Sequence, residues 1–340
     1  MGRHIRRMAW MLVVLMLPFT VGAAGPEQAA TERGAVTAGR FALELDGVAA
    51  GWVSEVDGGH AVADVVTTIL GADHLQKKHI GNVKYEEISV TMDAGMSIDL
   101  YKWLQDWLLG KAARKSGSII YLDREDHEVS RLNFSYALIT EVGFPALDAA
   151  SKDAAKMTIK LQPEYTRRVR GSGQSVKVPA SKQKKWLTSN FRLKIDGLDE
   201  STARVNKIEA LTIKQKVVEH PVGEMRDYEQ EATAVEIPNL VITLAESEAW
   251  PLYDWHEDFV LRGNNHQDKE KSGTLEFLAI DQKEVLFALE FRHLGIFKVT
   301  PDKMEAGAEG IRRVKAEMYC EDIRFTYSPA ATFGAVEHKS

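Results

Sequence analysis

Apolar and polar residues alternate with a period of two along much of the chain. The alternating apolar positions include Phe41, Leu43 and Leu45, then Leu132, Phe134, Tyr136 and Leu138, then Met157, Ile159 and Leu161, and finally Phe287, Leu289 and Phe291. Successive side chains of a strand point to opposite faces of a sheet, so this pattern predicts half-buried β-strands.

Two stretches have a helical period instead. Residues 98–109 and 250–262 carry apolar side chains every three to four positions. Ser97 is placed to cap the first N-terminus, and Pro251 lies in the first turn of the second, where its missing N–H costs little. The sequence therefore predicts a mainly β protein in which each domain is a β-sandwich or barrel with one packed α-helix.

The chain also repeats itself. Matching segments follow one another in the same order: 41–47 and 191–197, 88–92 and 240–244, 101–103 and 253–255, 115–118 and 271–274, and 132–134 and 289–291. Their offset grows slowly from 150 to 157 residues, as loop insertions would cause. We therefore predict a tandem duplication of one domain. Trp103 or Trp107 should be buried in the place that Trp255 or Phe259 takes in the second copy.

These matches set the expected domain limits at residues 40–165 and 190–328. Residues 166–189 between them hold seven Lys and Arg residues and no acid, which favours a solvated, mobile basic linker. A basic arm for an anionic surface is the alternative interpretation of this segment. Residues 329–340 are expected to form a flexible tail.

The N-terminal residues have the three-part pattern of a secretory signal. Arg3, Arg6 and Arg7 precede a short apolar run, and small residues end the segment at Ala24. The run of 14 residues, 8–21, is shorter than the ~20 residues that a membrane-spanning helix needs. We expect a signal peptide at residues 1–24, a flexible leader at 25–39, and export to the periplasm or the exterior with no membrane span after cleavage.

Composition limits the classes of partner. The net charge is −6 and becomes −9 once the three arginines of the signal are removed, so a nucleic-acid partner is not expected. The one cysteine, Cys320, cannot form an intramolecular disulfide or a cysteine metal cluster. It shares a face of an expected strand with Met318, which favours burial.

At this point the motifs and their order resemble a known family. Residues 81–88, Gly-Asn-Val-Lys-Tyr-Glu-Glu-Ile, lead into a strand, and a Tyr-x-Trp-Leu helix follows at Tyr101. A Lys-Ser-Gly-Ser turn, a Leu-Asn-Phe strand and residues 157–164 complete the first copy. This order is similar to that of the tail-tube proteins of contractile phages and phage-like particles, and most of each copy is covered.

The resemblance implies rings of six subunits that stack into a hollow tube, with inner strands lining the lumen. The type VI secretion tube protein is similar in fold. The loop that reaches the next ring would here be residues 57–82 and 207–233. Two features differ from the family pattern: typical members have a single domain, and they lack a secretion signal.

No set of residues assembles into a catalytic centre in the sequence. His256 lacks the second helical histidine of a zinc protease, and Ser175 is not on a nucleophile elbow. Asp123, Glu125 and Asp126 lack the spacing of a calcium loop. We therefore expect a non-enzyme with no catalytic, cofactor-binding or metal residues and no cofactor.

Three interpretations follow from these observations. The leading one is a secreted structural protein that self-associates through β-edges into rings or tubes, with three chains forming a pseudo-hexamer. The alternative is a secreted monomeric binding module that reuses the tail-tube fold and meets a protein cargo or surface partner. A hydrolase of unfamiliar arrangement is the third. Unpaired sheet edges would favour the first interpretation over the second.

Overall fold

The computed structural model describes residues 39–70, 75–179, 186–221, 228–303, 310–328 and 331–333. The predicted signal peptide at residues 1–24 lies outside the described residues, as do the leader up to residue 38 and most of the predicted tail. Among the described residues, no helix combines the length and the hydropathy that a membrane crossing requires.

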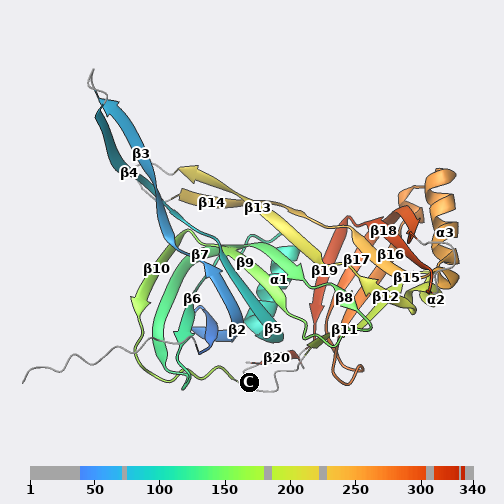
Figure 1. The fold of residues 1–340 in the computed structure, drawn as a ribbon, viewed down its shortest axis with the longest axis horizontal. Helices are drawn as coiled ribbons and strands as arrows, with labels where there is room; N and C mark the ends of the chain where they lie inside the picture. The colour runs from blue at the N-terminus through green and yellow to red at the C-terminus, as the bar shows by residue number, and fades with distance from the viewer. Residues whose placement is uncertain are drawn as a thin grey trace, which may run out of the picture. The chain divides into compact units, whose positions relative to one another are not determined.

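Repeat 1, residues 40–170, is built around a closed ring of strands (Figure 1). In order round the ring, β1, β2, β5, β9, β7 and β6 each pair with the next, and β6 pairs again with β1. The elements of this repeat are β1 (Phe41–Leu45), β2 (Val48–Gly58), β3 (Ala61–Leu70), β4 (Leu75–Tyr85), β5 (Ile88–Ser97), α1 (Ile98–Leu108), β6 (Lys115–Leu122), β7 (Glu128–Phe144), β8 (Leu147–Asp148), β9 (Met157–Gln162) and β10 (Tyr165–Arg170). A closed barrel of this size is filled by side chains.

Repeat 2, residues 186–327, follows the same strand order. Its elements are β11 (Trp186–Ile195), α2 (Asp199–Thr202), β12 (Val205–Ile208), β13 (Leu211–Pro221), β14 (Tyr228–Glu236), β15 (Leu240–Ala245), η1 (Glu246–Glu248), α3 (Trp250–His256), η2 (Glu257–Leu261), η3 (Gln267–Lys269), β16 (Lys271–Ala279), β17 (Val285–Pro301), β18 (Arg313–Tyr319) and β19 (Asp322–Tyr327). A last strand, β20 (Thr332–Phe333), returns to pair with β5 of repeat 1, so the flexible tail predicted at residues 329–340 was wrong at these positions. Repeat 2 stays open between β11 and β12, where α2 lies along β11.

The two repeats agree in register as well as in strand order. In the β3–β4 hairpin Val62 pairs with Lys84, and in the β13–β14 hairpin Lys214 pairs with Glu236, so both strands keep an offset of 152 residues. In both hairpins the register then shifts after the next pair. A shared β-bulge is a feature that related domains keep, so the hairpins are equivalent parts of one duplicated fold.

The long central strands share a second irregularity. Tyr136 in β7 has φ of 52° and His293 in β17 has φ of 55°, and these residues lie 157 positions apart. Positive φ is uncommon for residues other than glycine, and it recurs here at the same place in both copies. The structure therefore confirms the predicted tandem duplication of a mainly β fold with one principal helix in each copy.

The helices match the sequence expectation closely. The side chain of Ser97 accepts a hydrogen bond from the backbone N–H of Leu100, which caps α1. In repeat 2 the expected helix is divided into α3, of the α type, and η2, a π-helical turn. Trp103 and Trp107 are buried in α1, and so are Trp255 and Phe259 in α3 and η2.

Both repeats contribute to a single hydrophobic core. Phe144 of β7 stacks on Phe277 of β16 at 5.6 Å between ring centroids, and it also contacts Phe287 of β17 at 6.1 Å. Trp186 meets both Phe277 and Phe287 edge-on. Because these rings are buried together, the repeats are fused along their sides rather than strung on a tether.

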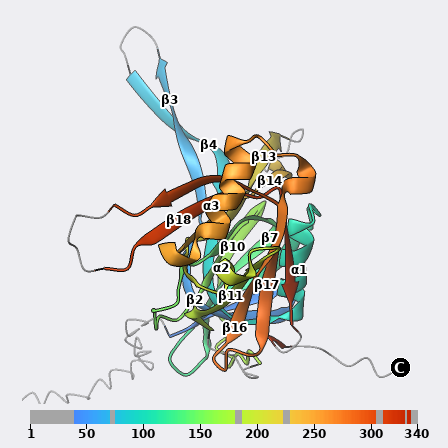
Figure 2. The same cartoon turned by 90° about the vertical axis from the view of Figure 1, so that its right-hand side faces the viewer.

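Three sequence expectations differ from the structure here. The linker expectation at residues 166–189 was wrong at both ends, because most of β10 and the start of β11 lie within it. Trp186, expected in the linker, is almost fully buried. The loops expected at 57–82 and 207–233 form the β3–β4 and β13–β14 hairpins, of which the first projects beyond the barrel in both views (Figures 1 and 2).

Cys320 is buried as expected, beside the end of β18. Burial raises the pKa of its thiol to about 11. A thiol in this state is protonated and unreactive at neutral pH.

The shared core predicts a large effect of Phe287. Phe287→Ala should lower the free energy of unfolding by ~3–5 kcal/mol, because the cavity would open among rings of both repeats. Ile280→Ala, at a side chain that is 58% exposed, is the control and should change it by no more than ~0.5 kcal/mol. Urea unfolding followed by tryptophan fluorescence measures both. Equal small effects would contradict a shared core.

Candidate functional site

The junction between the repeats begins with a β-ladder. The end of β7 pairs antiparallel with the base of β13, so that Val142 lies opposite Ile213 and Glu141 opposite Lys214. The carboxylate of Glu141 lies 3.6 Å from Lys214 Nζ and 3.1 Å from Lys160 Nζ. The β13–β14 hairpin of repeat 2 thus extends the sheet of repeat 1.

A buried polar pair anchors the hairpin next to this ladder. Trp107 of α1 donates its indole N–H to Gln215 Oε1 at 2.6 Å. The Gln215 amide nitrogen then donates to the carbonyl of Thr233 across the hairpin, at 2.7 Å. Gln215 is buried, and both ends of its amide are paired.

A second anchor holds the other strand of the hairpin. Arg114 forms an ion pair with Glu164 at 3.3 Å and donates to the backbone carbonyl of Gln230 in β14. The Gln230 side chain donates to the carbonyl of Pro163 at 3.2 Å. Gln230 is therefore buried in a seat made by the β9–β10 corner and by Arg114.

Helix α1 covers the far side of the junction. Tyr101 stacks on Phe325 and Tyr327 of β19, with ring centroids 5.8 and 5.2 Å apart. The Gln105 amide donates to the carbonyl of Phe325 at 3.0 Å. Repeat 1 therefore uses its helix, the end of β7 and the β9–β10 corner, whereas repeat 2 uses its hairpin and β19.

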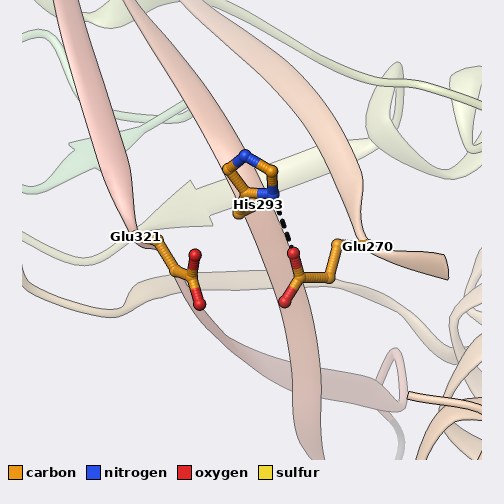
Figure 3. A group of neighbouring side chains, drawn as sticks. All are labelled: Glu270, His293 and Glu321. Atoms are coloured by element: carbon orange, nitrogen blue, oxygen red, sulfur yellow. Dashed lines mark hydrogen bonds and ion pairs between the residues drawn. The ribbon is translucent and has the colours of Figure 1, made fainter. Parts of the chain in front are cut away.

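The side-chain cluster in repeat 2 that offers metal-ligand atoms is formed by Glu270, His293 and Glu321 (Figure 3). His293 Nδ1 lies 2.9 Å from Glu270 Oε2, and the hydroxyl of Tyr319 donates to Glu270 Oε1 at 2.7 Å. Burial and the bond to Glu270 raise the pKa of Tyr319 to about 12. Both oxygens of Glu270 already have protein partners, so the cluster does not fit a dedicated metal centre.

The corresponding positions of repeat 1 explain what this cluster is. Glu270 and Glu321 match Arg114 and Glu164, at offsets of 156 and 157 residues. The seat that holds Gln230 in repeat 1 thus has a counterpart in repeat 2, in which an acid stands in place of the arginine.

The sequence predicted no catalytic, cofactor-binding or metal residues, and this stays a prediction. It missed the Glu270 cluster, because its members are far apart in the sequence and only the fold brings them together: Glu270 precedes β16, His293 is in β17, and Glu321 lies between β18 and β19. The duplicated offsets were the available signal, since they align these residues with Arg114 and Glu164.

A comparison with protein families finds a match that covers repeat 1. The profile of the T4-like virus tail tube protein gp19 family matches residues 37–167. Repeat 1 belongs to the tail-tube family. Repeat 2 has the same strand order and the same register shifts, so the protein carries two tail-tube repeats. No protein among the curated ones matches the chain.

Solved structures with some likeness include a sheath-tube complex of an extracellular contractile injection system, PVC, in its extended state. It is 19% identical over 44% of this chain and 99% of that chain, with a TM-score of 0.37. Hcp1 from Flavobacterium johnsoniae is 14% identical over 41% of this chain and 95% of its own, with a TM-score of 0.25. At these scores the assignment of the tail-tube repeats rests on the family profile and on the strand pairing.

The junction predicts a specific loss at Gln215. Gln215→Ala leaves the indole N–H of Trp107 and the carbonyl of Thr233 without their partner, so unfolding should become easier by ~1–3 kcal/mol. Gln76→Ala, on the exposed hairpin of repeat 1, should have an effect below ~0.5 kcal/mol. Chemical denaturation measures both, and a cycle with Trp107→Phe should show non-additive effects. Strict additivity would mean that the pair is not coupled.

Proposed function

We propose that this protein is an exported, non-enzymatic structural protein whose tail-tube repeats associate head to tail into closed rings. Three chains would supply the six repeats of one ring. Supporting this, repeat 1 belongs to the tail-tube family and repeat 2 has the same topology.

The junction inside the chain is the observation that carries the proposal. Two repeats of one fold meet through different surfaces, which makes the contact heterologous. In each chain two counterpart surfaces are not used by the junction. On repeat 1 they are the β3–β4 hairpin and β10, and on repeat 2 they are α3, the end of β17 and the β18–β19 corner. A heterologous contact that is repeated between chains gives a closed ring if the rotation closes and a filament if it does not.

Ring formation is tested on the chain from residue 25 onward. Light scattering after gel filtration should give a particle of three chain masses, and negative-stain images should show rings with six similar lobes. A particle that is a single chain at every protein and salt concentration would contradict the proposal and would favour the monomeric binding module.

Export is tested separately in the native host. The arginines, the short apolar run and the small residues near Ala24 predict cleavage there. The intact mass of the recovered protein should therefore correspond to a chain that begins after the signal. A chain that still begins at Met1, or that is recovered from the cytoplasm, would contradict export.

A further inference from the structure

Two sheet edges of the described chain lack a strand where their counterparts have one. The end of β7 pairs with β9 on one edge and with β13 on the other. The equivalent end of β17 pairs with β18, and no other described strand adds to it. In the same way β13 pairs with both β14 and β7, whereas β3 pairs among the described strands with β4 alone.

The offsets between the two repeats indicate which strand would pair with each of these edges. Positions 141–143 of β7 correspond to 298–300 of β17, and positions 212–214 of β13 correspond to 60–62 at the base of β3. When each residue of the β7–β13 ladder is replaced by its counterpart in the other repeat, residues 298–300 of one copy lie opposite residues 60–62 of another. We call this pairing the translated contact. One chain cannot make this contact with itself and also keep the junction described above, so the occupant is a second copy.

The buried pair beside the ladder changes character as a unit. Trp107 and Gln215 in the junction correspond to Phe259 and Ala63 in the translated contact. A hydrogen-bonded pair is replaced by two apolar groups, which leaves no donor or acceptor unpaired. Replacement of one partner alone would have buried an orphaned polar group.

The anchor of the second strand changes in charge. The junction seats the neutral Gln230 between Arg114 and the β9–β10 corner. Residue Lys78 of β4 corresponds to Gln230 at the hairpin offset of 152. The counterpart seat contains Glu270 and Glu321, so the ammonium group of Lys78 would lie beside two carboxylates (Figure 3).

The ion pairs near the ladder are reversed between the repeats. Glu141 pairs with Lys160 in repeat 1, whereas Lys298 pairs with Glu317 at 2.7 Å in repeat 2. The hairpins are reversed too. Asp64 pairs with Lys84 at 2.9 Å in repeat 1, and Lys216 pairs with Glu236 at 2.7 Å in repeat 2.

This reversal sets which repeats can meet. In the junction, Glu141 lines one pocket with Lys214 and Lys216, so an acid of repeat 1 faces two lysines of β13. In the translated contact Lys298 meets the hairpin that carries Asp64. Contact between two copies of repeat 2 would instead bring Lys298 against Lys216, and like charges disfavour it.

The helical side of the contact is complementary as well. Tyr101 and Gln105, which cover β19, correspond to Tyr253 and Glu257. The strand equivalent to β19 is β10, in which Arg168 and Arg170 stand at the positions of Phe325 and Tyr327. Where the junction has an aromatic stack, the translated contact would therefore place the acidic Glu257 beside the arginines of β10. Figure 2 shows α3 on the side of repeat 2 that faces the viewer.

We propose that repeat 2 of one chain binds repeat 1 of a second copy through this surface. The end of β17 takes the base of the β3–β4 hairpin, the Glu270–Glu321 seat takes Lys78, and α3 covers β10. The inference rests on the proposed ring and deepens it, because it fixes the register and an alternating order of repeats.

Charge reversal on the chain from residue 25 onward tests the proposal. Lys78→Glu and Glu321→Lys change exposed side chains, so each variant should unfold at the wild-type temperature. Each should raise the protein concentration needed for half-maximal association by about 10-fold or more. The double variant restores opposite charges between positions 78 and 321 while Glu270 is unchanged, so it should associate at least about 3-fold more tightly than either single variant. Sedimentation velocity measures association.

Lys77→Glu is the matched control. Lys77 is next to Lys78 in β4 and points to the other face of the strand, so this variant should associate like wild type. Unchanged association of both single variants, or a double variant as weak as the singles, would overturn this surface and leave the ring standing. Absence of association in the wild-type protein would overturn both the surface and the ring.

Discussion

The antiparallel pairing of β7 with β13 is the constraint on which the rest of the described chain depends. It places the hairpin of repeat 2 on the sheet of repeat 1, so that Gln215 can meet Trp107. It also brings Phe144 against the rings of β16 and β17. Because backbone bonds fix the register, the polar anchors of the β13–β14 hairpin at the junction are positioned by this ladder.

Local periodicity was enough to predict many of the strands and the helix at residues 98–109, and matching segments at a nearly constant offset were enough to predict the duplication. It failed for residues 57–82, because the β3–β4 hairpin is exposed on both faces. Val62, Val65 and Ile69 are all exposed, so no alternation of buried and exposed positions marks the strand. A hairpin that is exposed on both faces carries little periodic signal in its own sequence.

The burial of Trp186 and the Glu270 cluster could not be predicted for a different reason. Trp186 looks like part of a basic linker until Phe277 and Phe287, 91 and 101 residues further on, enclose it. Glu270, His293 and Glu321 come together only where the connection before β16, strand β17 and the β18–β19 turn meet. The sequence showed that the two copies correspond. Only the strand registers showed which of the residues that differ between the copies lie at positions that contact one another.

The shared core has an evolutionary consequence. Here removal of repeat 2 would expose Tyr101 and Phe144, and removal of repeat 1 would expose Phe287 and Phe325. A deletion would therefore expose apolar surface that favours aggregation of the remaining repeat. Because the two halves share their aromatic rings, loss of either copy would carry a cost in solubility.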